Sequence, residues 1–323
     1  MKVLFWGTPD FAVPTLRALS EEGHHVVGVV TQPDRPAGRG RALRPSPVKE
    51  LARAEGIDVL TPERPRGDDF MAELRRLNPD VSVVVAYGHL LRPEVLELPP
   101  HGSINVHASL LPELRGAAPI HWAIARGHDV TGVSIMQMTE GMDAGPVLHR
   151  VEVPIDEHES STELALRLAE VGAQALVQTL VLLENGLIEP EPQDHDAATF
   201  APKVGRDVAR IDWTRSAREV KDHVRAMDEV PGAWTELEGE PIKLFRPRLA
   251  PHDGVDDVAM AEAPAAAQPG SIIDALAGGE RGLGVATGEG TVWFGEVQPP
   301  GKRRMSVAAW LAGRGLQVGA RFQ

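Results

Sequence analysis

Short apolar runs alternate with amphipathic stretches along the first 150 residues, and this alternation constrains the fold more than any other feature of the sequence. The runs are rich in β-branched residues, as buried strands are, while the stretches between them show helical spacing of apolar residues. The strand candidates are 3–6, 26–31, 81–86, 103–106 and 131–136, and the helix candidates are 11–22, 48–54, 70–77 and 118–125. Buried strands alternating with helices predict an α/β domain with a doubly wound, mostly parallel sheet.

The second half of the chain has a different organisation. A long helix is expected at 161–184, with Ser160 and Glu163 as its capping box. Residues 190–207 contain Pro190 and Pro192 and are typical of a linker. Beyond it, one helix (217–226) and five short strand candidates follow, at 234–237, 242–245, 270–274, 283–286 and 291–297. This spacing indicates a small, OB-like β-barrel, so we expect a catalytic domain at 1–189 and a barrel domain at 208–323.

Cysteine content and hydropathy exclude several classes of protein. None of the 323 residues is cysteine, which excludes disulfides, thiolate metal sites and a cysteine nucleophile. The sequence has no uninterrupted run of 18 apolar residues, so we expect no membrane-spanning segment. The apolar start of the chain is too short for a secretory signal, and a cytoplasmic protein is expected.

The charge of the chain is uneven. The formal net charge is −13, and the first 200 residues carry 17 Lys and Arg against 29 Asp and Glu, which by itself disfavours binding to nucleic acid. Residues 34–49 are the exception, because they hold five bases and one acid. Their Pro and Gly content predicts an irregular, mobile loop. From charge alone, this loop is either a solvated insertion or a contact for a polyanion.

Asn105 and His107 are candidate catalytic residues. Side chains at i and i+2 of a strand point to the same face, so these two would lie side by side near a strand end. An amide can donate to a developing oxyanion, and an imidazole can carry a proton near neutral pH. The spacing alone is equally compatible with a turn asparagine and a half-buried histidine that bonds within the fold.

Asp143 is a third candidate, in the glycine-framed loop between Gly141 and Gly145. If the fold brings it to His107, its carboxylate can orient the imidazole and stabilise the imidazolium. Alone, an aspartate in such a loop is also a common turn former. No dinucleotide fingerprint, phosphate-binding loop, zinc-binding His spacing or nucleophile elbow is present, so none of those sites is predicted.

Several motifs together resemble the methionyl-tRNA formyltransferase family, nearly from end to end. They are Phe5-Trp6-Gly7-Thr8-Pro9-Asp10, Gln32-Pro33-Asp34-Arg35-Pro36, Ala86-Tyr87-Gly88, Ile104-Asn105-Val106-His107, Ser109-Leu110-Leu111-Pro112, Arg115-Gly116-Ala117-Ala118-Pro119, Asp143-Ala144-Gly145, Ile211-Asp212-Trp213, Pro231-Gly232-Ala233 and Gly301-Lys302-Arg303-Arg304. The chain departs from the family pattern at Glu113-Leu114, where a basic and an aromatic residue are usual, and at Arg92, where proline is usual.

The resemblance implies a Rossmann-like formyltransferase domain and a β-barrel that binds tRNA. It implies that the enzyme transfers the formyl group of 10-formyltetrahydrofolate to methionyl initiator tRNA, as a monomer and without a metal. Asn105, His107 and Asp143 would then be the catalytic residues. The folate would contact Tyr87, Gly88, Ser109, Leu110, Leu111 and Pro112. The tRNA would contact Arg35, Arg39, Arg41, Arg44, Lys49, Lys302, Arg303 and Arg304.

Two alternatives stay open at this point. An enzyme that uses the same formyl donor on an amino sugar or a ribonucleotide amine, or that hydrolyses the donor, would need neither the basic loop nor the barrel. A catalytically silent RNA-binding protein could keep the fold, although intact Asn105, His107 and Asp143 argue against it.

Overall fold

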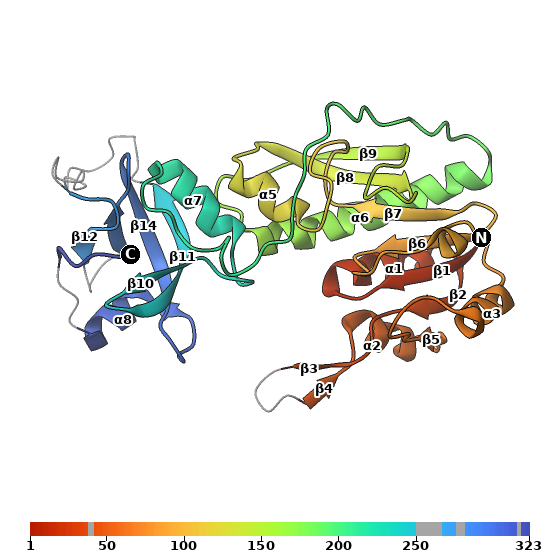
Figure 1. Cartoon of the computed structure of the whole chain (residues 1–323), viewed down its shortest axis with the longest axis horizontal. Coiled ribbons are helices and arrows are strands. Elements are labelled where there is room, and N and C mark those ends of the chain that lie inside the picture. The colour runs from red at the N-terminus through yellow and green to blue at the C-terminus, as the bar shows by residue number, and fades with distance from the viewer. Residues whose placement is uncertain (38–41, 250–266, 276–281, 315–317) are drawn as a thin grey trace. The chain divides into compact units, whose positions relative to one another are not determined.

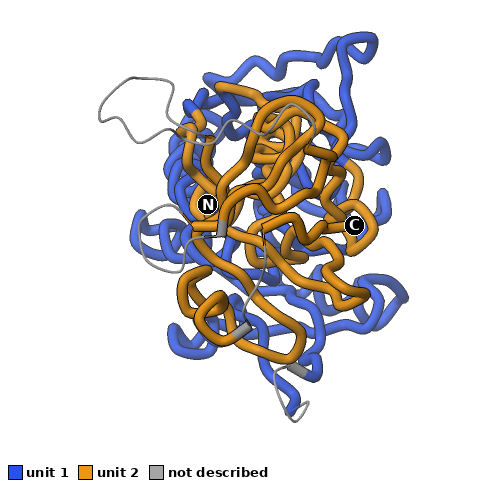
Figure 2. The backbone as a smooth tube through the Cα atoms, turned by 90° about the vertical axis from the view of Figure 1, so that its left-hand side faces the viewer, with its two compact units in different colours: residues 1–119, 130–154, 165–201 blue, residues 120–129, 155–164, 202–323 orange. Residues whose placement is uncertain are grey.

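The computed structural model describes residues 1–37, 42–249, 267–275, 282–314 and 318–323. The chain forms two compact units, which Figure 2 shows in different colours. Unit 1 comprises residues 1–119, 130–154 and 165–201, and unit 2 comprises residues 120–129, 155–164 and 202–323. These limits differ from the predicted domains at 1–189 and 208–323, because Glu191 pairs with Val147 and Gln193 is buried. The predicted limits remain our proposal for the domains that fold independently.

Unit 1 is built on a seven-stranded sheet (Figure 1). Its strands, in spatial order, are β5 (Val59–Leu60), β2 (His25–Val30), β1 (Lys2–Gly7), β6 (Val81–Val85), β7 (Ser103–His107), β8 (Val130–Gln137) and β9 (Val147–Pro154). The first five are parallel to one another, and β8 is antiparallel to both of its neighbours, β7 and β9. The chain winds outward from β1 in both directions, so the prediction of a doubly wound, mostly parallel sheet is confirmed.

Helices cover this sheet and bury the apolar residues of its strands. They are η1 (Asp10–Ala12), α1 (Val13–Glu21), α2 (Pro47–Ala54), α3 (Asp68–Leu77), α4 (Pro93–Leu96) and α6 (Ser161–Glu184), of which α6 begins in unit 2. Helix α6 packs closely on β7 and β8, because a Cβ at Gly172 would lie 2.8 Å from a methyl group of Val106. The predicted capping box is present: the Ser160 backbone N–H donates to Glu163, and the Glu163 N–H donates to Ser160.

Helix α6 is also long and apolar enough, by length and composition, to cross a membrane. No membrane-spanning segment was predicted from the sequence, because it has no uninterrupted run of 18 apolar residues. Leu168, Leu176 and Leu180 on this helix are completely buried. Their burial is typical of a helix that contributes to a protein core.

The described part of unit 2 contains an antiparallel sheet and several helices. The strands are β10 (Trp234–Leu237), β11 (Glu240–Leu249), β14 (Thr291–Gln298), β13 (Leu283–Ala286) and β12 (Ile272–Ala275) in spatial order, with β15 (Met305–Ser306) beside β14. The helices are α5 (Pro119–Ala125), α7 (Ala217–Ala226) and α8 (Val307–Arg314). The sheet is curled, and the last residues bridge its two outer strands through Leu237–Phe322 and Ser271–Arg321. This half-barrel agrees with the predicted small barrel.

The prediction of an irregular loop at 34–49 was wrong. Strands β3 (Arg35–Ala37) and β4 (Ala42–Arg44) form an antiparallel pair, and α2 begins at Pro47. Proline at the first helical position is favourable, because its missing N–H has no partner there in any helix. Ser46 caps the helix by accepting a hydrogen bond from the Lys49 N–H at 3.1 Å.

Candidate active site

Strand β7 carries the first two candidate residues. Asn105 and His107 occupy alternate positions of the strand, as predicted, and therefore face the same side of the sheet. His107 is buried and Asn105 is partly exposed. Among the described residues, none forms a hydrogen bond with the Asn105 side chain. Its amide is therefore able to donate to a ligand.

Each ring nitrogen of His107 lies near an oxygen atom. Its Nε2 lies 3.0 Å from the carbonyl oxygen of Leu114. A carbonyl can only accept, so Nε2 carries the hydrogen. In the neutral imidazole the Nδ1 lone pair is then free, and Nδ1 lies 3.7 Å from Oδ2 of Asp143. The predicted approach of Asp143 to His107 is therefore present in the structure.

The Asp143 carboxylate is fixed by a backbone donor. The Gly116 N–H donates to its Oδ2 at 2.8 Å. Gly116 has φ +121, and a Cβ at this position would lie 2.8 Å from the Ala201 carbonyl oxygen. Glycine is therefore required here for two reasons, the backbone conformation and the close approach of residue 201.

Three residues around the site other than glycine have left-handed backbone conformations. They are Ala86 (φ 47), Leu114 (φ 57) and Asp143 (φ 50). Such conformations persist where surrounding contacts impose them, and they concentrate at functional sites. Ala86 follows β6, Leu114 lies in the segment after β7, and Asp143 lies in the loop after β8.

A cavity of about 720 Å³ lies in unit 1 beside this group. It is lined by Pro93, Leu96, Glu97, Pro100, His101, Gly102, Ser103, Gln137, Met138, Thr139, Glu140, Gly141 and Leu183. Ser103 is on the same face of β7 as Asn105 and His107, and Gly141 is two residues from Asp143. The volume is within the usual range of about 300–1,000 Å³ for small-molecule sites.

Comparison with known proteins identifies the family. The formyl transferase family model matches residues 1–180, and the model of the formyl transferase C-terminal domain matches residues 203–315. Methionyl-tRNA formyltransferases of Bacillus cytotoxicus and Bacillus thuringiensis are each 44% identical to this chain over 323 residues, which cover 100% of this chain and 98% of theirs. The chain belongs to the methionyl-tRNA formyltransferase family.

Solved structures share the fold of this family member at low sequence identity. HypX from Aquifex aeolicus in complex with tetrahydrofolic acid matches with a TM-score of 0.65 and 19% identity, over 96% of this chain and 47% of that chain. The sugar 3N-formyl transferase WlaRD, in the presence of dTDP and 5-N-formyl-THF, matches with a TM-score of 0.64 and 14% identity, over 94% of this chain and 99% of that chain. At these identities the likeness concerns the fold alone.

The residues predicted to contact folate occupy a different position from the cavity. Ser109, Leu111 and Tyr87 are buried, and none of the six predicted residues lines the cavity. Burial raises the pKa of Tyr87 to about 12, and its ring packs edge-on against Trp6 at 5.3 Å. The Tyr87 side chain is thus part of the core, while its backbone carbonyl accepts hydrogen bonds from the Thr8 and Gln32 side chains.

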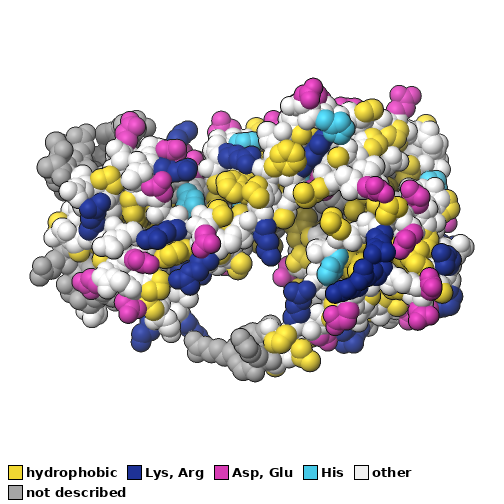
Figure 3. Space-filling model, viewed as in Figure 1, with side chains coloured by type: hydrophobic (Ala, Val, Ile, Leu, Met, Phe, Trp, Pro, Cys, Tyr) yellow, Lys and Arg dark blue, Asp and Glu magenta, His cyan; other side chains and the backbone are white. Residues whose placement is uncertain are grey.

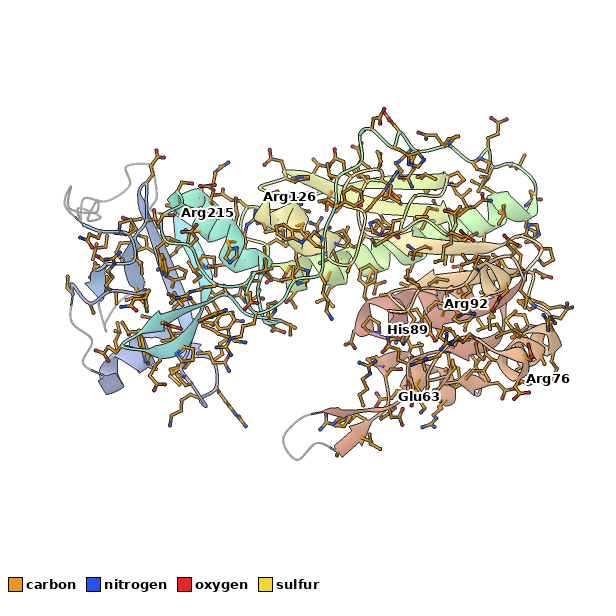
Figure 4. The ribbon with its side chains drawn as sticks, viewed as in Figure 1. Glu63, Arg76, His89, Arg92, Arg126 and Arg215 are labelled. Carbon is orange, nitrogen blue, oxygen red and sulfur yellow. The ribbon has the colours of Figure 1, made fainter. Side chains whose placement is uncertain are left out.

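The segment that follows β6 also carries His89 and Arg92, which Figure 4 labels. The His89 ring lies 5.6 Å from the Tyr87 ring, and Arg92 lies 3.9 Å from Glu94. Arg92 is one of the departures from the family pattern. It is exposed at the residue that precedes α4.

The residues predicted to contact tRNA at 34–49 differ in their surroundings. Arg35 and Arg44 are exposed and face each other across the β3–β4 pair. Lys49 is buried, and its Nζ lies 2.6 Å from Oδ1 of Asp34. Arg39 and Arg41 lie outside the described residues.

The predicted residues at 302–304 also differ from one another. Lys302 and Arg303 are exposed. Arg304 instead donates to Asp228 at 3.2 Å and to Glu296, and its guanidinium lies 4.1 Å from the Phe245 ring centroid. On the face seen in Figure 3, basic and acidic side chains are intermingled, so the exposed cations do not merge into one basic surface there.

Sequence reasoning gave no role to Gln193 and Arg115, which the structure places beside the Asp143 loop. Gln193 fell in the predicted linker, and Arg115 entered only as part of a family motif. Both are buried, although their residue types are usually exposed. No cluster of three or more His, Asp or Glu side chains suited to a metal ion occurs in the described part of the chain.

Proposed function

We propose that this enzyme transfers the formyl group of 10-formyltetrahydrofolate to the α-amino group of methionyl initiator tRNA, and so supplies N-formylmethionyl-tRNA for translation initiation. The observation that carries the proposal is the 44% identity to methionyl-tRNA formyltransferases over the whole chain, including all of unit 2. The sugar formyl transferase that shares the fold over 94% of this chain is only 14% identical to it, so the second unit alone does not carry the proposal.

The formyl donor is a folate, which fits the cavity of unit 1. The pteridine ring presents amide and amine groups on a flat apolar ring. The cavity offers polar Gln137 and Thr139 beside apolar Leu96 and Met138. We assign the folate ring to this cavity, with the formyl group directed along the face of β7 toward Asn105.

The reaction begins when the neutral methionyl amine attacks the formyl carbon. A new N–C bond forms, and the formyl oxygen becomes an oxyanion. The Asn105 amide donates to this oxygen and stabilises its charge. The bond from carbon to N10 of the folate then breaks, which restores the C=O bond.

One proton must pass from the attacking nitrogen to N10 of the leaving folate. His107 takes this proton at Nδ1 and returns it to N10. The Leu114 carbonyl holds the opposite ring nitrogen, and the Asp143 carboxylate stabilises the imidazolium. The net result is formylmethionyl-tRNA and tetrahydrofolate, with no other reactant consumed.

The tRNA requires cations that are not already paired within the protein. Arg35 and Arg44 form no ion pair with any residue that the structure describes, and like charges that face each other across two strands are destabilising without a counter-ion. A phosphate between them would remove the repulsion. Lys302 and Arg303 are further contacts in this proposal, while the pairing of Lys49 and Arg304 suits them to support the surrounding structure.

Formyl transfer by the purified protein tests the proposal. The assay supplies 10-formyltetrahydrofolate with methionyl initiator tRNA or methionyl elongator tRNA, and a His107→Asn preparation controls for contaminating enzyme. We expect rapid formylation of the initiator species. Consumption of the folate without formylated tRNA, or transfer to an amino sugar instead, would contradict the proposed acceptor.

The tRNA contacts have their own test in Arg44→Ala. We expect a higher KM for tRNA, a salt dependence whose slope falls by about one, and an unchanged KM for folate. Arg304→Ala is the contrasting variant, because it breaks ion pairs inside unit 2 and should lower the unfolding temperature. An effect of Arg44→Ala on folate alone would contradict the assignment.

A further inference from the structure

Gln193 is the buried residue whose bonds reach the Asp143 loop directly. It is 7% exposed, and its Nε2 donates to the carbonyl oxygens of Asp143 at 2.9 Å and Gly145 at 2.6 Å. Its Oε1 accepts from Arg115 Nε at 3.0 Å and from Nη2 at 2.7 Å. Both donors and both acceptor positions of the amide are thus occupied.

Arg115 supplies this amide with a buried positive charge. The residue is 5% exposed, and its side-chain partners are Gln193 and Nδ1 of His195, at 3.1 Å. Neither partner is a carboxylate, and no ion pair with Arg115 occurs among the described residues. Burying an uncompensated charge is unfavourable, so packing alone does not explain the arrangement. The charge polarises the Gln193 amide and strengthens its two donated bonds.

The hydrogen bonds from Gln193 reach the loop where its backbone is strained. Asp143 has φ 50, and the two accepting carbonyls flank Ala144 immediately after it. Among the described residues, the Asp143 side chain is held by the Gly116 N–H and approaches His107. The direction of the carboxylate therefore depends on where the loop backbone lies.

The same segment of chain also holds the other partner of His107. The Leu114 N–H donates to Thr199 Oγ1 at 2.9 Å, and the Arg115 N–H donates to the Thr199 carbonyl at 2.9 Å. The Leu114 carbonyl is the acceptor for His107 Nε2. Residues 193–199 thus bind the backbone on both sides of the imidazole.

We infer that Gln193, backed by Arg115, is a positioning residue for the reaction: it fixes the loop so that the Asp143 carboxylate faces His107. The expected kinetic effect rests on the proposed function, whereas the contact between Gln193 and the loop does not depend on it. Gln193 touches neither substrate in this account and acts through Asp143.

The Gln193→Glu variant tests the inference. It keeps the shape and the partner for Arg115, but it removes both donors to the loop carbonyls. We expect kcat to fall by up to about 10²-fold, the usual result of displacing a catalytic group by about 1 Å, with little change in either KM. Glu191→Gln is the matched control. Glu191 lies two residues before Gln193, and the substitution removes its exposed ion pair with Arg150, which should leave kcat unchanged.

Measuring the effect of Gln193→Glu in the Asp143→Asn variant distinguishes a positioning role from a general loss of stability. If Gln193 acts through Asp143, Gln193→Glu should cause little further loss once that carboxylate is gone. An equal loss in both backgrounds, or an unchanged kcat in the wild-type background, would overturn the inference. Arg115→Lys keeps the positive charge but cannot donate the pair of hydrogen bonds to Oε1 of Gln193. It should lower kcat in the same way but by less. This variant tests the inference if Gln193→Glu folds poorly.

Hydrogen exchange gives a reading that does not need activity. Amides in the peptide 139–147 should exchange faster in Gln193→Glu and at the wild-type rate in Glu191→Gln. Unchanged exchange would contradict the inference. Failure of wild-type protein to formylate methionyl-tRNA, with faster exchange in the variant, would contradict the proposed function and leave the positioning of the loop supported.

Discussion

Strand β7 and the loop 139–145 each carry part of the proposed active site, and they hold their side chains by different means. On β7, the alternation of the strand places Asn105 and His107 on one face. In the loop, Asp143 depends on a backbone donor 27 residues away in sequence and on a glutamine 50 residues away. A strand position is set locally, while this loop position is set by distant parts of the chain.

The largest loss of kcat should come from replacing His107, which lies on β7 and contacts Asp143 of the loop. His107→Asn keeps a donor but cannot take up a proton, and we expect kcat to fall by about 10²–10⁴-fold. Binding of tetrahydrofolate, measured by titration, should change little. Near-normal turnover would remove His107 from the proton path and leave the two regions without a common function.

A smaller effect is expected on the strand side alone. Asn105→Ala removes one donor to the oxyanion and should lower kcat by about 10²–10³-fold. Ile104→Val is the matched control on the opposite face of β7, where the side chain is completely buried. It should lower stability by about 1 kcal/mol and spare turnover. Equal kinetic losses in both variants would contradict a role set by strand alternation.

The loop side is tested by Gly145→Ala. A Cβ at this position would overlap the Gln137 carbonyl oxygen, so the loop must move. We expect kcat to fall by up to about 10²-fold, because Asp143 moves with the loop. Gly205→Ala is the control, since a Cβ there meets nothing within 4 Å. Normal turnover in Gly145→Ala would mean that the loop tolerates displacement and that the position of Asp143 does not depend on distant contacts.

The same contrast explains what the sequence could predict. Five of the seven strands of the sheet, the capping box of α6 and the pair on one face of β7 follow from local patterns, and the structure has them. Strands β5 and β9 were not predicted. The approach of Asp143 to His107 was an expectation from the fold. Strand β8 is antiparallel to β7, so its end at Gln137 lies beside Ile104, and the loop that follows brings Asp143 to 3.7 Å from His107.

Contacts between distant residues were not predictable in this way. Gln193 has no local signal that marks it as buried, because its burial depends on Arg115, 78 residues away. The cavity was missed for a similar reason, since its lining comes from three segments that meet only in the folded protein. At 34–49, proline and glycine suggested an irregular loop, although proline is compatible with the first turn of α2 and with a short, isolated strand pair.

The most direct test of the account is the coupling between His107 and Asp143. The measurement is kcat for formyl transfer in the wild type, in His107→Asn, in Asp143→Asn and in the double variant. The account predicts that Asp143→Asn lowers kcat strongly by itself but changes it by no more than about twofold once His107 is replaced, because the carboxylate acts through the imidazole. If the two losses multiply in the double variant, the two residues act independently and the proposed site is wrong.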